Sequence, residues 1–395
     1  MKRFLAIVLA LAMVFALCAC GGNDKDKETD KPDTAAYKVA MITDYGDITD
    51  QSFNQTTYEA CKAFCDKNSV EFKYYKPTAD STAARVEMVE QAVAEGFNVI
   101  VMPGFAFAGT IAECQDTYPD VKFIGLDISE FDLYDSFYNH DKDGNRTDLK
   151  DPNNKEHISK NVYCAVYQEE LCGYMAGYAA VKLGYTKLGF LGGMAVPAVI
   201  RYGFGFVQGA DAAAKELDTK IEINYVYGGQ FSGDADITAK MDTWYNAGTE
   251  VVFACGGGIF TSACEAATKQ GVNGKVIGVD SDQSYVINTN YGQGVCVTSA
   301  MKGLAPTVNT VLKAIKDGNW KDYYGTISNM GMVSGTDPSL NYVQLPTATW
   351  SMTNFTKADY ATLVGKIYNG TIKISSDTSA MPKTTVKVTT QDNIQ

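Results

Sequence analysis

Short apolar runs alternate with longer amphipathic stretches along the chain, and this alternation limits the fold more than any other feature. In the first half, the runs YKVAMIT, EFKYYK, NVIVM and VKFIGL are rich in β-branched and aromatic residues, and the last one leads to Asp127. Helical periodicity fills the stretches between them, at 52–67, 81–95 and 107–118. Four strands separated by three helices predict a parallel, doubly wound α/β sheet.

The same alternation begins again after a polar interruption, with the runs VYCAV, KLGFL, EINYVY, EVVFAC and KVIGVD. The two halves close on similar strands, FIGLD and VIGVD, each ending in an aspartate. We therefore expect two Rossmann-like, doubly wound lobes joined by a hinge, with a ligand held between the carboxyl ends of their strands. The expected division is 37–161 with about 281–320 for the first lobe, and 162–280 with about 321–395 for the second.

The polar interruption, 130–160, contains the sequence NHDKDGNRTDLKDPNNKEH. Its acidic spacing resembles a calcium loop, but the glycine falls at the wrong offset and no glutamate closes the loop. We interpret the segment as a solvated excursion at the rim of the first lobe, with calcium binding as the alternative.

Charge and motifs argue against an enzyme and against several classes of partner. The net charge of −12 disfavours nucleic acid and an anionic membrane surface. The chain has only two histidines, His140 and His157, both in the polar interruption. It contains no P-loop, no G-x-S-x-G elbow and no dinucleotide-binding glycine pattern. We expect no catalysis and no cofactor.

The cysteines of the body are expected to be structural rather than metal-binding. Cys18 and Cys20 stand near the N-terminus, which leaves eight others. Most of these lie within apolar strand or helix patterns, where a free thiol packs as a small hydrophobe. Cys61 and Cys65 are one helical turn apart, but no second pair and no nearby histidine would complete a metal site. Disulfide pairing stays open.

The N-terminus resembles a bacterial lipoprotein signal. Lys2 and Arg3 precede the apolar stretch FLAIVLALAMVFAL, and LCAC is followed by the polar sequence GGNDKDKETDKPDT. We interpret 1–19 as a signal peptide, Cys20 as the lipidated first residue, and 20–36 as a disordered linker. The protein would then be extracytoplasmic and lipid-anchored to a bacterial cell membrane. A plain signal peptide or a short membrane anchor is the alternative.

Polar residues at the strand ends are the candidate ligand contacts. Asp44, Asp127 and Asp280 follow strands in corresponding places, and Phe53 and Asn54 begin the first helix. Carboxylates, an aromatic ring and an amide suit a neutral, flat ligand rich in hydrogen-bond donors, and they would repel a phosphate. The alternatives are structural: aspartate as a helix cap, and phenylalanine as a hydrophobic staple. Ser52, with Gln55 three residues on, predicts a capping box for this helix.

A family resemblance makes this ligand more specific. The segments DYGDITDQSFNQTTYEA, EELCGYMAGYAA, RYGFGFVQGA, YGGQF, CGGGIF and VIGVDSDQ occur in this order, from Tyr37 to about Ile374. Together they resemble the basic membrane protein family, the nucleoside-binding lipoproteins of bacterial ABC importers. The resemblance implies a clamshell of the type I periplasmic-binding-protein kind.

The resemblance also implies individual roles. A purine base would stack between Phe53 and Phe231, one ring from each lobe. Asn54, Asp44 and Asp127 would bind the edge of the base, while Asp280 and Lys302 would hold the ribose hydroxyls. In CGGGIF, the backbone N–H of Gly257 is a candidate contact for a ligand oxygen, or else part of a tight strand-to-helix turn.

The function implied is capture of a purine nucleoside and its delivery to an ABC permease with its ATPase, by a monomer anchored through Cys20. One alternative keeps the fold and binds a neutral sugar. Another is a sensory or adhesive surface lipoprotein that works without a transporter.

Overall fold

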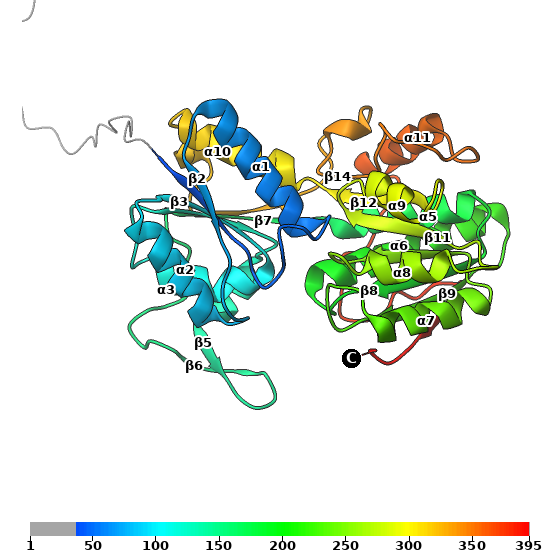
Figure 1. Cartoon of the computed structure of the whole chain (residues 1–395), viewed down its shortest axis with the longest axis horizontal. Helices are drawn as coiled ribbons and strands as arrows, with labels where there is room; N and C mark the ends of the chain where they lie inside the picture. Colours follow the sequence, from blue (N-terminus) through cyan, green and yellow to red (C-terminus); the bar gives the residue numbers. More distant parts are fainter. Residues whose placement is uncertain (1–36, 395) are drawn as a thin grey trace, which may run out of the picture. The chain divides into compact units, whose positions relative to one another are not determined.

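Two mainly parallel sheets organise the computed structural model, which describes residues 37–394 (Figure 1). The first sheet has the strand order β13-β7-β4-β3-β1-β2 and is parallel throughout. Its strands are β1 (Val39–Ile42), β2 (Phe72–Tyr75), β3 (Val99–Pro103), β4 (Lys122–Leu126), β7 (Val162–Tyr167) and β13 (Thr326–Met330).

The second sheet has the order β14-β12-β11-β10-β8-β9-β15, in which only the β12–β14 pair is antiparallel. Its strands are β8 (Lys187–Gly192), β9 (Glu222–Tyr227), β10 (Val251–Cys255), β11 (Lys275–Asp280), β12 (Cys296–Lys302), β14 (Val343–Gln344) and β15 (Lys387–Thr390). We call each sheet with its helices a lobe. The prediction of two doubly wound α/β lobes is confirmed.

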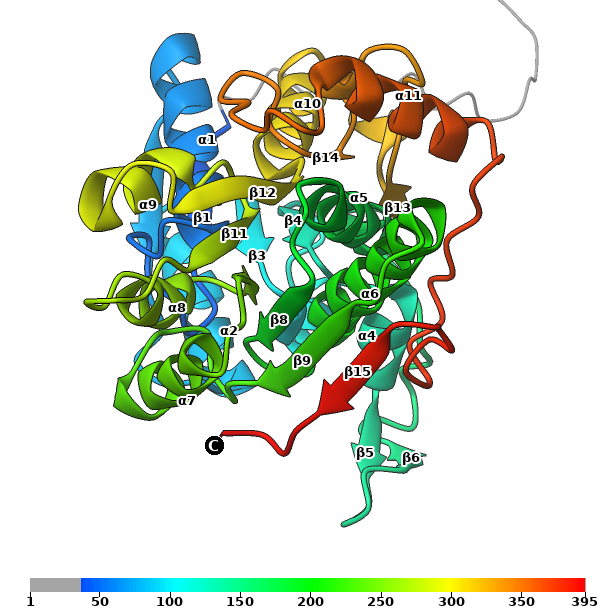
Figure 2. The same cartoon turned by 90° about the vertical axis from the view of Figure 1, so that its right-hand side faces the viewer.

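Helices cover both faces of each sheet (Figures 1 and 2). The central strands β1, β3 and β10 are buried along their whole length, as expected for parallel strands sandwiched between helices. The helices are α1 (Phe53–Asn68), α2 (Thr82–Ala94), α3 (Ala108–Cys114), α4 (Glu130–Asp135), α5 (Glu169–Lys182), α6 (Pro197–Leu217), α7 (Ala235–Asn246), α8 (Phe260–Ala267), α9 (Ser284–Tyr291), α10 (Leu304–Lys316) and α11 (Lys357–Tyr368).

The chain passes between the lobes three times: after β7, after β12 and between β13 and β14. The expected division of the chain needs three corrections. β7 was assigned to the second lobe but continues the first sheet beside β4, and β12 was assigned to the first lobe but lies beside β11. β13, also assigned to the second lobe, pairs with β7. A strand's own pattern does not reveal its partner, because pairing is decided by distant residues.

The polar interruption begins with α4 and continues into a hairpin of β5 (Tyr138–His140) and β6 (Arg146–Leu149) that projects from the first lobe (Figure 2). Its residues are mostly exposed, which confirms the solvated excursion. Asp141, the first residue of its turn, accepts hydrogen bonds from the backbone of Asp143 and Asn145. Residues 37–394 contain no group of acidic, histidine or cysteine side chains arranged to hold a metal ion.

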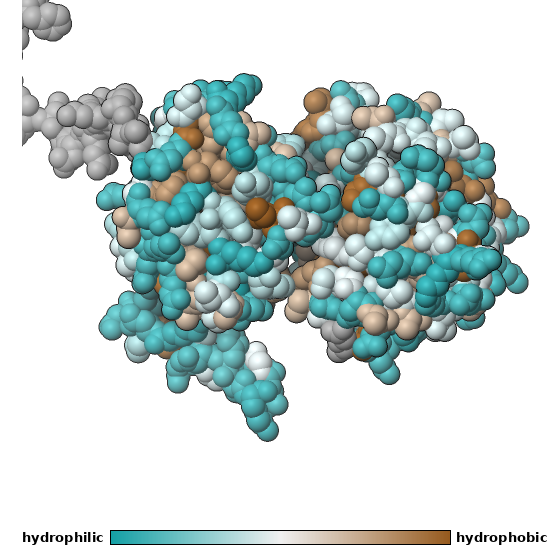
Figure 3. Space-filling view, viewed as in Figure 1, coloured by the Kyte–Doolittle hydropathy of each residue, from teal (hydrophilic) through white to brown (hydrophobic). Residues whose placement is uncertain are grey.

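All eight cysteines of the described chain are buried, as their apolar surroundings predicted, and all are free thiols. The face in Figure 3 is mainly hydrophilic, with hydrophobic residues in small, separate patches. No helix within residues 37–394 is long and apolar enough to cross a membrane. The predicted signal peptide, Cys20 and linker lie outside the described residues.

Four glycines allow α5 and α6 to pack backbone to backbone. A Cβ atom at Gly173 or Gly177 of α5 would lie 2.1 Å from a carbonyl oxygen of α6, that of Tyr202 or Phe206 respectively. The same holds in reverse for Gly205 and Gly209 of α6, whose Cβ atoms would meet the carbonyl oxygens of Glu170 and Tyr174 at 2.1 and 1.9 Å. This close approach fixes the first turn of α6 next to the start of α5, where the candidate site begins.

Replacing Gly177 by alanine should destabilise the protein by about 3 kcal/mol or more, because the clashing atom is backbone and the helices must separate. Gly365→Ala is the matched control. Gly365 also lies inside a helix, α11, but its Cβ would approach only the Gly335 carbonyl oxygen, at 3.2 Å. Urea unfolding measures both variants. Equal losses of unfolding free energy would contradict the packing argument.

Candidate functional site

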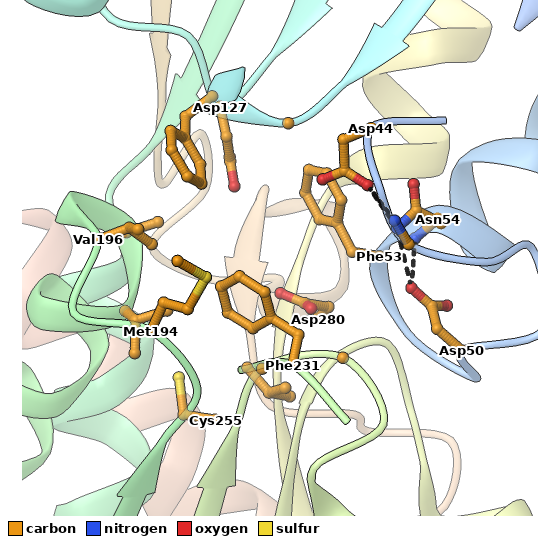
Figure 4. A pocket seen from close by; sticks show the side chains of 18 of the residues that line it. Asp44, Asp50, Phe53, Asn54, Asp127, Met194, Val196, Phe231, Cys255 and Asp280 are labelled. Carbon is orange, nitrogen blue, oxygen red and sulfur yellow. Dashed lines mark hydrogen bonds between the residues drawn. The ribbon is translucent and has the colours of Figure 1, made fainter. Parts of the chain in front are cut away.

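A cavity of about 670 Å³ lies between the carboxyl ends of the two sheets (Figure 4). Its walls come from the segments after β1, β3 and β4 in the first lobe, and from those after β8, β9, β10 and β11 in the second. Every predicted binding residue lines it: Asp44, Phe53, Asn54, Asp127, Phe231, Gly257, Asp280 and Lys302. Its volume lies in the range usual for small-molecule sites.

Asp44 organises the first corner of the cavity. Its Oδ1 accepts hydrogen bonds from the backbone N–H groups of Tyr45 and Gly46, both at 2.7 Å. The Asn54 amide nitrogen lies 3.5 Å from the same oxygen and 3.3 Å from Asp50 Oδ2 (Figure 4). Burial raises the pKa of Asp44, although these hydrogen bonds oppose that shift. Asn54 therefore enters the site with its amide orientation set by two carboxylates.

The predicted capping box at Ser52 and Gln55 is wrong. The Ser52 side chain makes no capping hydrogen bond, and Asp50 instead accepts from the backbone N–H groups of Ser52, Asn54 and Gln55. The Ser52 hydroxyl donates to Asp280 Oδ2 of the other lobe, at 2.7 Å. A local sequence motif cannot reveal this acceptor, which is 228 residues away. Asp50 thus caps α1, which leaves the Ser52 hydroxyl to bond Asp280 in the other lobe.

Lys302 is the centre of a buried charge cluster at the second corner. Its Nζ lies 2.5 Å from Asp127 Oδ2, and 3.6 Å from both Asp280 Oδ1 and Glu169 Oε1. The side chain is only 3% exposed, so Lys302 is not a surface lysine. Burial alone would lower the pKa of Lys302, but the three carboxylates raise it instead. The ammonium group therefore stays charged, 4.6 Å from the centre of the Phe53 ring.

Asp127 lies with this cluster, whereas we expected it to act with Asn54 and Asp44. The structure pairs it with Lys302, which comes from the other lobe. Asp127 and Asp280 both adopt left-handed backbone conformations, with φ of 60° and 65°. That conformation is uncommon outside glycine and often marks a functional site. The two strand-end aspartates thus occupy equivalent positions in the two lobes.

The two predicted stacking rings face the same cavity from opposite lobes (Figure 4). Phe231 stacks on Tyr45, with ring centres 6.4 Å apart and planes inclined by 22°. The Tyr45 hydroxyl lies 3.4 Å from the sulfur of Met194 in the second lobe. Gly257 has φ of 52°, and a Cβ there would lie 2.7 Å from the Phe231 carbonyl oxygen. The tight-turn interpretation of Gly257 is therefore correct, and its contact with a ligand stays a prediction.

Glu169 and Arg201 are site residues that the sequence analysis missed. Glu169 begins α5 and is fully buried, and its Oε2 accepts a hydrogen bond from Arg201 Nε at 2.6 Å. Arg201 comes from the first turns of α6 and lines the cavity. Both stand in quoted motifs, EELCGYMAGYAA and RYGFGFVQGA. The available signal was a pair of glutamates at the start of α5 and an arginine in the first turns of α6.

Comparison with known proteins identifies relatives of this chain. A family model described as ABC transporter substrate-binding protein PnrA-like (Bmp) matches residues 37–376. The ABC transporter nucleoside-binding protein BmpA of Lactococcus lactis is 26% identical over 85% of this chain and 90% of its own length. Basic membrane protein A1 of Borrelia garinii is 25% identical, covering 78% of this chain and 79% of its own.

Among solved structures, an ABC transporter solute-binding protein of Aeropyrum pernix aligns with a TM-score of 0.63 at 18% identity. The alignment covers 85% of this chain and 87% of that protein. At this identity the likeness concerns the fold alone.

Ser52→Ala should loosen the contact between the lobes, because a hydrogen bond to a charged acceptor contributes about 1.5–3 kcal/mol. We expect backbone amide hydrogen exchange to rise about 10-fold or more in peptides spanning 50–56 and 279–284. Thr49→Ala is the control, since the Thr49 hydroxyl bonds only Asp47, within its own lobe. Unchanged exchange at 279–284 in Ser52→Ala would show that this bond does not join the lobes.

Glu169 should make stability depend on pH. Burial raises its pKa from 4.5 to about 7 despite Arg201 and Lys302, so the folded state holds a proton that the unfolded state releases between these values. The free energy of unfolding should therefore rise as pH falls through this window. Urea unfolding from about pH 7.5 to about pH 5.0 should show this rise in the wild type and a smaller one in Glu169→Gln. Glu113→Gln, at an exposed site on α3, should keep the wild-type slope.

Proposed function

Because this chain belongs to the Bmp family of ABC transporter substrate-binding proteins, we propose that it captures purine nucleosides in the cavity between its lobes. It would then deliver them to an ABC permease with its ATPase. Its proposed role is binding outside the cytoplasm. The relative from Lactococcus lactis that is named a nucleoside-binding protein supports this ligand class.

The observation that carries the proposal is the pairing of aromatic walls with two separate polar corners. Phe53 and Phe231 offer π surfaces from opposite lobes, which suits a flat base. Asp44 and Asn54 form one corner, able to bind the donors and acceptors at the edge of the base. Asp280 and Lys302 form the other, where a carboxylate accepts from a vicinal diol and an ammonium donates to it.

Asp127 joins this second corner in our proposal. Its carboxylate shares Lys302 with Asp280, so it lies nearer the sugar than the base. The backbone N–H of Gly257 remains available to a ligand oxygen from the opposite wall. This arrangement revises only the position of Asp127 among the roles that the family resemblance implied.

The charge of the cavity supports a nucleoside over a nucleotide. Its lining contains seven aspartates and two basic residues, Arg201 and Lys302. A phosphate group would meet these carboxylates in a partly dehydrated space, where like charges 4 Å apart repel by about 4 kcal/mol at an effective dielectric constant near 20. The cavity thus disfavours phosphorylated ligands while its carboxylates accept hydrogen bonds from hydroxyl and amino groups.

Ligand capture would be coupled to contact between the lobes. Ser52 donates to Asp280, and Gln283 Nε2 donates to the Gln51 carbonyl oxygen at 3.0 Å, so the rim beside the sugar corner joins both lobes directly. A bound nucleoside touching Phe53 and Asp280 would add to these contacts and favour the closed arrangement. We further propose that Cys20 is lipidated, which tethers a monomer to the membrane beside its permease.

Calorimetric titration of the chain from Gly21, which retains every described strand and helix, tests the ligand class. The protein is first unfolded and refolded to remove copurified ligand, then titrated with adenosine, guanosine, inosine, cytidine, uridine, ribose and galactose. We expect tight binding of purine nucleosides, and binding at least about 100-fold weaker for the corresponding 5′-monophosphates. Binding of a sugar alone would favour the sugar alternative, and binding of none of these would overturn the ligand assignment.

Phe53→Ala should weaken purine nucleoside binding by about 10-fold to 100-fold, since stacking of a base on an aromatic ring contributes about 1–3 kcal/mol. Phe131→Ala is the matched control, because Phe131 is 68% exposed and does not line the cavity. Calorimetry with the best-bound nucleoside measures both. Equal affinity for wild type and Phe53→Ala would remove the stacking role.

A further inference from the structure

Arg201 presents hydrogen-bond donors to the cavity that no group within the described residues uses. Its side chain is 19% exposed, and it lines the cavity from the second lobe. Its single protein hydrogen bond within residues 37–394 runs from Nε to Glu169 Oε2. A guanidinium carries five N–H donors, so the four on its two terminal nitrogens remain for water or a ligand.

Glu169 holds this guanidinium in place. The carboxylate is fully buried at the start of α5, and it bonds Arg201 at 2.6 Å while its other oxygen lies 3.6 Å from Lys302 Nζ. The close glycine packing of α5 on α6 fixes the distance between the two residues. Arg201 is therefore an oriented donor rather than a mobile surface side chain, and orienting it before binding lowers the entropy lost with a ligand.

The acceptor that suits Arg201 is neutral. Glu169, Asp127 and Glu170 are the acidic groups whose charges act on it. With so many carboxylates around one guanidinium, an anionic ligand group would gain little from Arg201 and would be repelled by its neighbours. A hydroxyl oxygen accepts a charge-assisted hydrogen bond there without adding negative charge.

The sugar is the part of the ligand that lies within reach. Glu169 connects Arg201 to Lys302, which with Asp280 forms the corner proposed for the vicinal diol. The 2′- and 3′-hydroxyls are taken by that pair, so the hydroxyl left without a partner in the ribose is the one at 5′. Resting on the proposed function, we propose that Arg201 is a ligand-binding residue that recognises the 5′-hydroxyl of the nucleoside, with Glu169 as its positioning residue.

A matched comparison of ligands and variants tests the pairing of Arg201 with this hydroxyl. Calorimetry gives the dissociation constants of the best-bound purine nucleoside and of its 5′-deoxy, 3′-deoxy and 2′-deoxy analogues. In the wild type, loss of the 5′-hydroxyl should weaken binding about 10-fold to 100-fold, since it leaves a charged donor without its acceptor. We call the dissociation constant of the 5′-deoxy analogue divided by that of the parent nucleoside the 5′ ratio, and define the 2′ and 3′ ratios in the same way. In Arg201→Met the 5′ ratio should fall to about 1–3, because the donor is absent. Arg201→Lys, which keeps the charge but not the oriented fork, should give an intermediate ratio.

The controls separate a local pairing from a general loss of structure. Arg146→Met removes an exposed arginine of the β5–β6 hairpin and should keep the wild-type ratio. Glu169→Gln should reduce the 5′ ratio more than the 2′ and 3′ ratios, which a merely damaged site would not do. If Arg201→Met does not fold, the test uses Arg201→Lys alone. A 5′ ratio in Arg201→Lys equal to that of the wild type then overturns the inference.

The remaining outcomes also decide between the two proposals. The inference would be overturned, with nucleoside binding intact, if Arg201→Met kept the 5′ ratio of the wild type. It would also be overturned if Arg201→Met lowered the 2′ or 3′ ratio instead of the 5′ ratio. Should the wild type bind only a sugar, the proposed nucleoside function fails, and D-ribose against 5-deoxy-D-ribose repeats the Arg201 test. If the wild type binds neither class of ligand, both proposals fall.

Discussion

The buried ammonium of Lys302 is the interaction on which the rest of the site depends. It stands among Asp127, Asp280 and Glu169, which come from three different segments and would repel one another without it. Removing one member of a buried charge cluster destabilises a protein far more than replacing every member by apolar residues, because the remaining charges stay dehydrated. Lys302 thus allows two strand-end aspartates to approach each other closely enough to form one polar corner of a cavity.

The two strand-end aspartates are related by more than their position in the fold. Asp127 of the first lobe is bonded by Lys302 of the second, and Asp280 of the second lobe is bonded by Ser52 of the first. Each lobe therefore supplies the donor that compensates the buried acid of the other. Both aspartates hold left-handed backbone conformations, and these contacts across the cavity help to offset the cost of that backbone.

The sequence predicted the elements of the fold better than their partners. Apolar periodicity identified both sheets, because buried parallel strands are continuous apolar runs such as VIVMP of β3. The partners of β7, β12 and β13 were wrongly assigned, since three passages between the lobes leave no mark in local composition. The eight predicted residues do line one cavity, as motif positions at strand ends implied. Glu169, Arg201 and the role of Ser52 were missed because each depends on a partner distant in sequence.

The direct bonds between the lobes have a consequence for the transporter. Ser52 with Asp280, and Gln283 with the Gln51 carbonyl, join protein to protein, so part of the free energy of closing does not come from the ligand. Such contacts raise the share of closed protein even without ligand, together with the Lys302–Asp127 pair that also joins the lobes. A permease that recognised only the relative position of the lobes would therefore accept empty carriers, competing with loaded ones for its docking face. Efficient uptake then requires either that these contacts stay weak or that the permease senses the cargo itself.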